Sequence, residues 1–281
     1  MRETSYDLRG LRFAALEWGS PVGIPTVLVH GWLDHAGSWE RVAEGLEGWI
    51  VAPDLRGHGR SPWIGPGETY HVAEYVADLD ALVVALGGRV RLVGHSLGGA
   101  ITTYYAGARP QRVVALAVVD GIGLPDGGAR ARDRLVEFLD GAVNWRVPRP
   151  MASLDEAARR VRAARSTIDD AWARRLAERG TRVVPAGVAW AWDPRHRIRA
   201  AATYRQDQHL QLLRAIPCPV LSVHPGSSLF DAADVAALEA AIPDLRVVTL
   251  PGVGHMVPLE APVALAAVLV PFLSGASPSS P

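Results

Sequence analysis

The sequence predicts an α/β fold in which helices cover both faces of a mostly parallel sheet, and two observations lead to this prediction. Short apolar runs rich in Val, Leu and Ile alternate with helical patterns along most of the chain. These runs are apolar throughout rather than at every second residue, which is typical of strands buried on both faces. With 281 residues, 49% of them hydrophobic, the chain can bury such a core.

The elements follow in chain order. Residues 5–9 and 12–18, joined at Gly10, predict an opening hairpin. The central strands are expected at 26–30, 49–52, 90–94 and 113–119. A helix is expected at 71–87, because apolar residues recur there at spacings of three and four and Gly87-Gly88 end the pattern. The pattern resumes with strands at 220–224 and 246–250 and helices at 232–241 and 262–273.

One segment, residues 125–202, breaks the alternation, because it is rich in Arg and Ala and has the pattern of several helices. We expect a helical cap inserted over the sheet, with residues 1–124 and 203–281 forming the core domain. The cap segment holds four of the nine tryptophans, Trp145, Trp172, Trp190 and Trp192. These side chains either face a substrate or only pack the interior of the segment itself.

Composition excludes several classes of function. The 29 basic residues balance 29 acidic ones, so the chain has no excess positive charge for binding nucleic acid. Every basic residue is Arg, because the sequence contains no Lys, and this excludes a P-loop lysine or a Schiff-base lysine. The single cysteine, Cys218, cannot form an internal disulfide, and no cluster of ligands indicates a metal site. We therefore expect neither a metal nor a cofactor.

The N-terminus and the longest apolar run bear on location. The first ten residues are partly acidic and lack an apolar stretch, so they predict no secretory signal and favour a cytoplasmic protein. Residues 261–273 contain two prolines and fall short of the roughly 20 residues that a membrane span requires. They predict a buried helix, and we expect no contact with a membrane.

The sequence RLVGHSLGGA, residues 91–100, places a candidate nucleophile, Ser96, where a strand turns into a helix. Such a turn strains the serine backbone, and Gly94 and Gly98 let neighbouring backbone pass close enough to expose the hydroxyl. The helix behind it offers free N–H groups where an oxyanion would form. The pattern Gly-x-Ser-x-Gly also occurs by chance, so the flanking strand and helix are what favour a nucleophile.

A serine hydroxyl needs a base to remove its proton, and histidine is the usual one near neutral pH. Among nine histidines we favour His255, because it follows the last predicted strand in a glycine-rich loop and would lie at the carboxyl edge of the sheet. His95 adjoins the serine but is expected to point away from it. A position at the surface or in the packed core better explains the histidines without a strand-end position, His58, His196 and His209.

Two further segments follow strands. His30-Gly31-Trp32 ends a predicted strand, so the backbone N–H of Trp32 would join that of Leu97 in holding an oxyanion. The glycines of DLRGHGRS, residues 54–61, suggest a phosphate cradle, but no helix with Lys-Ser or Lys-Thr follows. This second segment therefore predicts a structural turn.

Together these segments resemble the α/β-hydrolase superfamily over almost the whole chain. The matching motifs are, in the superfamily's order, HGWLDHAGSW, APDLRGHGRSP, LVGHSLGGA and LPGVGHMVPLEAP. A closer resemblance to the serine hydrolase-like branch lies in HGWLDHAGSWERV, ERGTRVVPAGVAWAWDPRHRI and YRQDQHLQLLRAI. The resemblance implies an eight-stranded sheet with a helical cap after strand six. It also implies Ser96 as the nucleophile, His255 as the base, and the Trp32 and Leu97 amides as oxyanion-hole donors.

The acid departs from the superfamily's usual pattern. Many relatives place an Asp shortly after strand seven, where this chain has HPGSSLFD, with Ser228 near the expected position and Asp231 later. Asp120 directly follows strand six, an arrangement similar to that of haloalkane dehalogenases. We favour Asp120 over Asp231, and either carboxylate would accept the imidazole Nδ1–H and stabilise the imidazolium. The alternative roles are a turn carboxylate for Asp120 and a first-turn helix acid for Asp231.

These residues predict a serine hydrolase, carboxylesterase-like, that cleaves a small-molecule ester or related acyl compound through an acyl-enzyme. The cap would line the substrate pocket with Trp145, Trp190 and Trp192, which suggest a bulky or aromatic substrate. Dehalogenases and epoxide hydrolases use an Asp nucleophile where this chain has Ser96, so neither of these activities is favoured. Two alternatives stay open: a cyclase, lyase or carbon–carbon bond hydrolase on the same fold, and a receptor that binds a ligand without turnover. The sequence indicates no oligomeric state.

Overall fold

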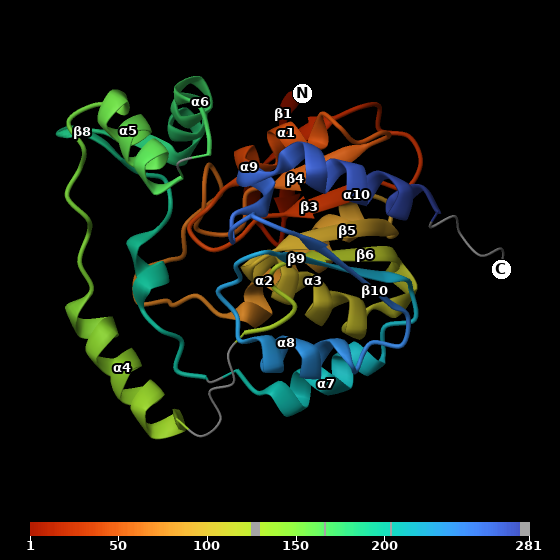
Figure 1. Cartoon of the computed structure of the whole chain (residues 1–281). Helices are drawn as coiled ribbons and strands as arrows, with labels where there is room; N and C mark the ends of the chain where they lie inside the picture. Colours follow the sequence, from red (N-terminus) through yellow and green to blue (C-terminus); the bar gives the residue numbers. More distant parts are fainter. Residues whose placement is uncertain (125–129, 166, 203, 276–281) are drawn as a thin grey trace.

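An eight-stranded sheet runs through the centre of the computed structural model, which describes residues 1–124, 130–165, 167–202 and 204–275 (Figure 1). The strand order is β1-β2-β4-β3-β5-β6-β9-β10. The strands are β1 (Arg2–Leu8), β2 (Leu11–Trp18), β3 (Thr26–Val29), β4 (Ile50–Pro53), β5 (Val90–His95), β6 (Val113–Val119), β9 (Val220–Pro225) and β10 (Leu245–Leu250). β1 and β2 form an antiparallel hairpin, β2 is antiparallel to β4, and the remaining pairs are parallel. The prediction of a mostly parallel sheet is confirmed.

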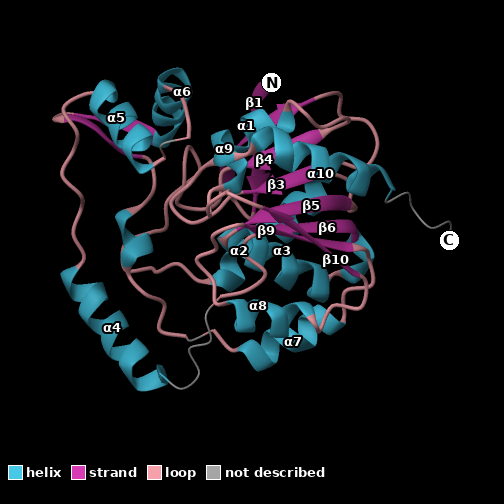
Figure 2. Ribbon diagram, in the orientation of Figure 1, coloured by secondary structure: helices cyan, strands magenta, loops and turns pink. Residues whose placement is uncertain are grey.

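Helices cover both faces of the sheet (Figure 2). One face carries α2 (Val72–Ala85), α3 (Leu97–Ala108), α7 (Gln206–Arg214) and α8 (Ala232–Glu239). The other face carries the 3-10 helix η1 (Ala36–Trp39), α1 (Glu40–Ala43), α9 (Val257–Glu260) and α10 (Pro262–Gly275). Within the described ranges, none of the helices has the length and apolar character needed to cross a membrane.

The two-sided cover explains why the central strands are continuously apolar. All seven residues of β6 are buried. Leu116 and Val118 join the core beneath α2 and α3, whereas Ala117 and Val119 join the core beneath α1 and α10. Because neighbouring residues of a strand point to opposite faces, a strand between two apolar cores needs an apolar side chain at every position.

The inserted segment, meaning the described residues of 130–202, leaves the sheet after β6. It contains α4 (Ala131–Asn144), α5 (Leu154–Ala164), α6 (Asp170–Gly180), β7 (Thr181–Val184), β8 (Gly187–Trp190) and the 3-10 helix η4 (Pro194–Arg197). β7 and β8 form an antiparallel hairpin, which the expected pattern of several helices in this segment did not include. Each strand has only four residues, and buried residues do not alternate with exposed ones. The sequence therefore lacks the alternation of apolar and polar residues by which a strand is predicted.

The inserted segment has an apolar core of its own that includes Val161, Trp172 and Leu176. Leu259 of α9 also packs into this core and joins the inserted segment to the sheet domain. Trp172 is 4% exposed, so for this tryptophan the packing interpretation holds.

Candidate active site

Ser96 occupies a sharp turn between β5 and α3. Its φ of +53° lies in the region that L-residues with a side chain rarely adopt. The turn is fixed by two backbone hydrogen bonds: Ser96 N–H donates to the carbonyl of Val119 (3.1 Å), and Gly99 N–H donates to the carbonyl of Ser96 (2.9 Å). A serine in this position is held by the surrounding backbone rather than by its own conformational preference.

Two glycines allow three elements to meet at this turn. A Cβ atom on Gly98 would lie 2.2 Å from the carbonyl oxygen of Val29, at the end of β3. A Cβ atom on Gly94 would lie 2.4 Å from the carbonyl oxygen of Gly98. Neither position can hold a side chain without moving backbone, so the close approach of β3, β5 and α3 requires both glycines.

His255 connects the serine to a carboxylate. It lies in the loop after β10, with Nε2 3.1 Å from Ser96 Oγ and Nδ1 2.6 Å from Asp120 Oδ2. A carboxylate accepts hydrogen bonds, so Nδ1 carries the imidazole proton and Nε2 is left to accept the serine proton. The imidazole therefore has the tautomer of a general base.

Asp120 directly follows β6 and is 6% exposed. Its φ is +43°, and its N–H donates to the carbonyl of Val223 in β9 (3.0 Å). Oδ2 faces His255, and Oδ1 accepts a hydrogen bond from Ser228 Oγ (2.6 Å). Both oxygens of this buried carboxylate thus have partners.

Asp231 lies elsewhere. It precedes α8, where Oδ1 accepts the N–H groups of Ala233 (2.8 Å) and Asp234 (3.2 Å) and so caps the helix. Of the two acids considered from the sequence, Asp120 is the one beside the imidazole.

Three residues that sequence reasoning gave no role hold the others in place. Besides Ser228, Glu260 of α9 accepts the N–H groups on both sides of His255, from Gly254 (2.8 Å) and Met256 (3.2 Å). His95 Nε2–H donates to the carbonyl of His255 (2.8 Å). Burial, followed by the nearby ring of His255, lowers the pKa of His95 to about 4, so it stays neutral. A Glu five residues after the candidate base, in HMVPLE, was the one available sequence signal.

The candidate oxyanion donors come from the two segments that adjoin the serine. Leu97 is the first residue of α3, so its N–H has no acceptor within the helix. Trp32 follows Gly31, where an added Cβ would lie 3.1 Å from Ser96 Cβ, so the loop after β3 passes directly against the serine. Trp32 as a whole residue is 53% exposed.

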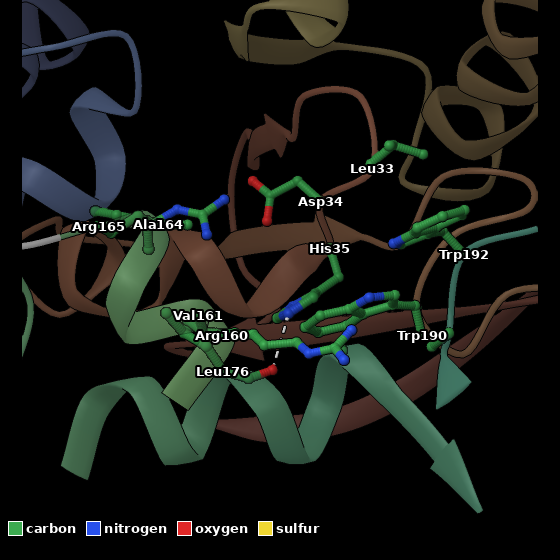
Figure 3. A pocket seen from close by; sticks show the side chains of 14 residues that line it. Leu33, Asp34, His35, Arg160, Val161, Ala164, Arg165, Leu176, Trp190 and Trp192 are labelled. Carbon is green, nitrogen blue, oxygen red and sulfur yellow. Dashed lines mark hydrogen bonds between the residues drawn. The ribbon is translucent and has the colours of Figure 1, made fainter. Parts of the chain in front are cut away.

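The three tryptophans expected in the substrate pocket differ in their surroundings. Trp190 and Trp192 line a cavity of about 160 Å³ between the inserted segment and the loop after β3 (Figure 3). Trp145 follows α4 and is 39% exposed at the surface. The lining residues of the cavity include neither Ser96 nor His255, but they include Leu33, which directly follows Trp32.

The remaining sequence features are structural. Asp54, at the start of the 54–61 turn, accepts the N–H groups of Ala36 (2.7 Å) and Arg60 (2.9 Å). Of the surface and core positions left open for the three histidines without strand-end positions, the structure shows the core, because all three are buried, His58, His196 and His209. Across the part of the chain that the structure describes, no group of three His, Cys, Asp or Glu side chains is arranged to hold a metal ion.

Comparison with known proteins gives consistent matches over most of the chain. The sequence model of the alpha/beta hydrolase family matches residues 26–268. A probable serine hydrolase of Drosophila melanogaster is 31% identical over 280 residues, spanning 92% of this chain and 83% of that protein. A serine hydrolase-like protein of Danio rerio is 28% identical over 278 residues, spanning 93% and 85%. The structure also matches the thioesterase domain from the curacin biosynthetic pathway, with a TM-score of 0.87 and 29% identity over 96% of this chain and 99% of that one.

Proposed function

This chain belongs to the alpha/beta hydrolase family, near its serine hydrolase-like branch, and from that premise we propose that it cleaves an ester or related acyl substrate, as a carboxylesterase does, through an acyl-enzyme. One observation carries the proposal: the continuous hydrogen-bonded path from Ser96 through His255 to Asp120. The strained turn at Ser96 and the glycines around it support the same assignment.

Acylation uses the serine and the histidine together. Ser96 Oγ attacks the carbonyl carbon of the substrate while its proton passes to His255 Nε2. Asp120, hydrogen-bonded to Nδ1, stabilises the imidazolium that forms. The negative charge that develops on the carbonyl oxygen is held by the backbone N–H groups of Trp32 and Leu97. The imidazolium then gives its proton to the leaving alcohol, and the acyl group stays on Ser96.

Deacylation repeats these steps with water. His255 Nε2 takes a proton from a water molecule as its oxygen attacks the acyl carbon. Collapse of the second tetrahedral intermediate returns the proton to Ser96 Oγ and releases the acid. The cycle uses no metal and no cofactor, and the inserted segment acts as the cap that covers the substrate.

A thioester is a second candidate substrate. The likeness to a thioesterase domain, at 29% identity over nearly the whole of both chains, favours it. The chemistry is the same, because Ser96 attacks the same carbonyl carbon and only the leaving atom changes from oxygen to sulfur. A thiolate is the better leaving group, so acylation would depend less on protonation by His255.

The test is hydrolysis of short p-nitrophenyl esters and matched acyl thioesters by the wild-type protein and the Ser96→Ala variant. We expect turnover of the wild type, loss of about 10³-fold or more in kcat in the variant, and a substrate-derived acyl mass on Ser96 in quenched reactions. The acyl mass distinguishes hydrolysis from a cyclase or lyase activity, and turnover distinguishes it from a silent receptor. Unchanged turnover in Ser96→Ala would exclude the proposal.

A further inference from the structure

The cavity beside Trp190 and Trp192 shares chain segments with the candidate active site. One wall is the loop after β3, with Leu33 one residue, or about 3.8 Å of backbone, beyond Trp32. Another wall includes Leu259, which is four residues after His255. Two walls of the cavity thus belong to the chain segments that carry the proposed oxyanion donor and the proposed base.

Its size and apolar walls limit what it can hold. The volume is about 160 Å³, close to that of an engineered cavity of about 150 Å³ that binds benzene. Apolar side chains face it from three helices, Val161, Leu176 and Leu259, and the indole of Trp190 lies beside them (Figure 3). Its size therefore suits one small ring or a short branched chain that carries a small terminal group.

Asp34 supplies an unmatched acceptor. The residue is 8% exposed, and its Oδ2 has no hydrogen-bond partner among the described residues. Burial alone raises the pKa of this carboxyl, but the rings of His35 and His30 and the guanidinium of Arg165 outweigh that effect and lower it. Asp34 is therefore a buried carboxylate at neutral pH, and a buried acceptor without a donor is unfavourable.

Arg165 supplies the matching donor. It follows the last residue of α5, and Figure 3 shows its guanidinium facing the carboxylate of Asp34. Its Nε is buried and has no acceptor in the described ranges. Within the described residues no ion pair or hydrogen bond joins Arg165 to Asp34, so the two charges face each other without direct contact.

The other two ionisable side chains of the cavity, His35 and Arg160, already have partners. His35 Nε2–H donates to the carbonyl of Leu176 (3.1 Å), and Nδ1 accepts the N–H of Gly37 (3.1 Å). Arg160 is paired with Glu156 (2.7 Å). The charged groups that a ligand would meet are the Asp34 carboxylate and the Arg165 guanidinium, and their charges sum to zero.

We propose that this cavity binds the part of the substrate remote from the scissile bond, and that this part is a small ring or branched chain ending in a neutral group that both donates and accepts hydrogen bonds, such as a carboxamide. Its N–H would donate to Asp34 and its carbonyl would accept from Arg165. A ligand carboxylate would meet the like charge of Asp34, and an ammonium would meet that of Arg165. The inference rests on the proposed function, because it assigns the cavity to the substrate of Ser96.

Binding to the purified full-length chain tests the cavity without any turnover. The probes are benzamide, benzoate, benzylammonium and toluene, with Kd measured by ligand-observed NMR. We expect benzamide to bind about tenfold or more tighter than the other three. Equal or weaker binding of benzamide would overturn the proposal, as would a crystal structure in which water alone bridges Asp34 and Arg165 at saturating benzamide.

Two variants test the named side chains. Asp34→Asn and Arg165→Gln should each raise the Kd of benzamide about tenfold and leave that of toluene unchanged. Arg159 is an exposed arginine on α5, the helix that Arg165 follows. Arg159→Gln is therefore the matched control and should leave the Kd values of benzamide and toluene unchanged. Thermal unfolding of each variant shows whether Asp34→Asn still folds. If it does not, Arg165→Gln decides, and an unchanged benzamide Kd there would refute the proposal.

Hydrolysis then links the cavity to Ser96. The p-nitrophenyl esters of 3-carbamoylbenzoic and 3-methylbenzoic acid differ only in the terminal group. Asp34→Asn should lower kcat/KM about tenfold for the carbamoyl ester alone. If Ser96→Ala retains activity while benzamide binding still depends on Arg165, the proposed function fails and the binding site stands. If Ser96→Ala is inactive and the two esters respond equally to Asp34→Asn, the inference fails alone.

Discussion

At the residue scale, the candidate nucleophile and its candidate acid share an uncommon backbone conformation. Ser96 has φ +53° and Asp120 has φ +43°, although neither is glycine. Their segments press against each other, because a Cβ on Gly121 would lie 2.2 Å from the carbonyl oxygen of Ser96. A non-glycine residue in such a conformation costs on the order of 1–3 kcal/mol. The site therefore reduces the stability of the fold to which it belongs.

This strain can be measured by comparing two variants that both lose the serine hydroxyl. Ser96→Gly relieves the strain because glycine adopts positive φ freely, whereas Ser96→Ala keeps a Cβ. After the greater freedom of glycine in the unfolded chain is allowed for, Ser96→Gly should be more stable by about 1 kcal/mol. Urea unfolding gives the difference. Equal or lower stability of Ser96→Gly would show that the turn is not strained.

The assignment of the acid can be tested with a matched pair of substitutions. Asp120→Asn should lower kcat for ester hydrolysis by about 10²–10⁴-fold, because the imidazole then lacks the charge that fixes its tautomer and stabilises its protonated form. Asp231→Asn should keep the wild-type kcat, because asparagine caps a helix as well as aspartate. The opposite order of effects would assign the acid to Asp231.

The residues that sequence reasoning identified and those that it missed differ in one physical respect. Ser96, Asp120 and His255 each directly follow a strand or lie in the loop after one, so local pattern predicts their place at the sheet edge. Ser228 also lies in a loop after a strand, but its role depends on a contact made only in the folded chain, with Asp120, which is 108 residues away. No periodicity or motif encodes such a contact.

At the element scale, one buried carboxylate joins the inserted segment to the core. Arg179 of α6 is 7% exposed, and its Nη2 donates to Asp54 Oδ2 (2.7 Å). Asp54 is fully buried and also accepts the N–H of Ala36, at the start of η1. The ion pair therefore links α6 to the segment that follows the proposed oxyanion loop.

Removing the arginine leaves the buried carboxylate without its counter-charge. Arg179→Gln should lower the free energy of unfolding by about 3 kcal/mol or more. Arg174→Gln, on the same helix, removes the exposed partner of Asp155 and should cost less than about 1 kcal/mol. Urea unfolding of the two variants checks this. Equal effects would show that the Arg179–Asp54 pair does not fasten the segment.

Burial distinguishes the elements that the sequence predicted from the hairpin that it did not. The run predicted at 113–119 coincides with β6, because burial on both faces imposes an unbroken apolar sequence. The hairpin of β7 and β8 was missed, because its residues are exposed or half-buried and no core imposes a period on them. Burial, more than propensity, determined which elements the sequence could reveal.

At the scale of the whole molecule, six histidines are buried, His30, His35, His58, His95, His196 and His209. Burial is the leading cause of their lowered pKa values, which are about 4 for His95, His196 and His209. The unfolded chain binds protons at these positions from about pH 6.5 downward. In the folded chain His95, His196 and His209 do not bind them until about pH 4, and the pKa values of the other three are also lowered, so stability is lost as the pH falls below 6.5.

Acid sensitivity follows from this difference in proton binding. The free energy of unfolding should fall by several kcal/mol between pH 6.5 and pH 4.5, as measured by urea unfolding at fixed ionic strength. His209→Gln removes one of the groups and should make the dependence on pH shallower. The exposed His71→Gln is the control and should leave the slope unchanged. A flat profile in the wild type would contradict this account.

The order of the strands in the sheet has a consequence for biosynthesis. β5, which leads to Ser96, is separated from β10 by β6 and β9, and the loop carrying His255 forms only after β10 has paired with β9. When a nascent chain has emerged from the ribosome up to the end of the inserted segment, it already contains Ser96 but does not yet contain His255. On the proposed mechanism such a chain would be inert toward esters and thioesters, and hydrolysis would begin only after the final strand has docked.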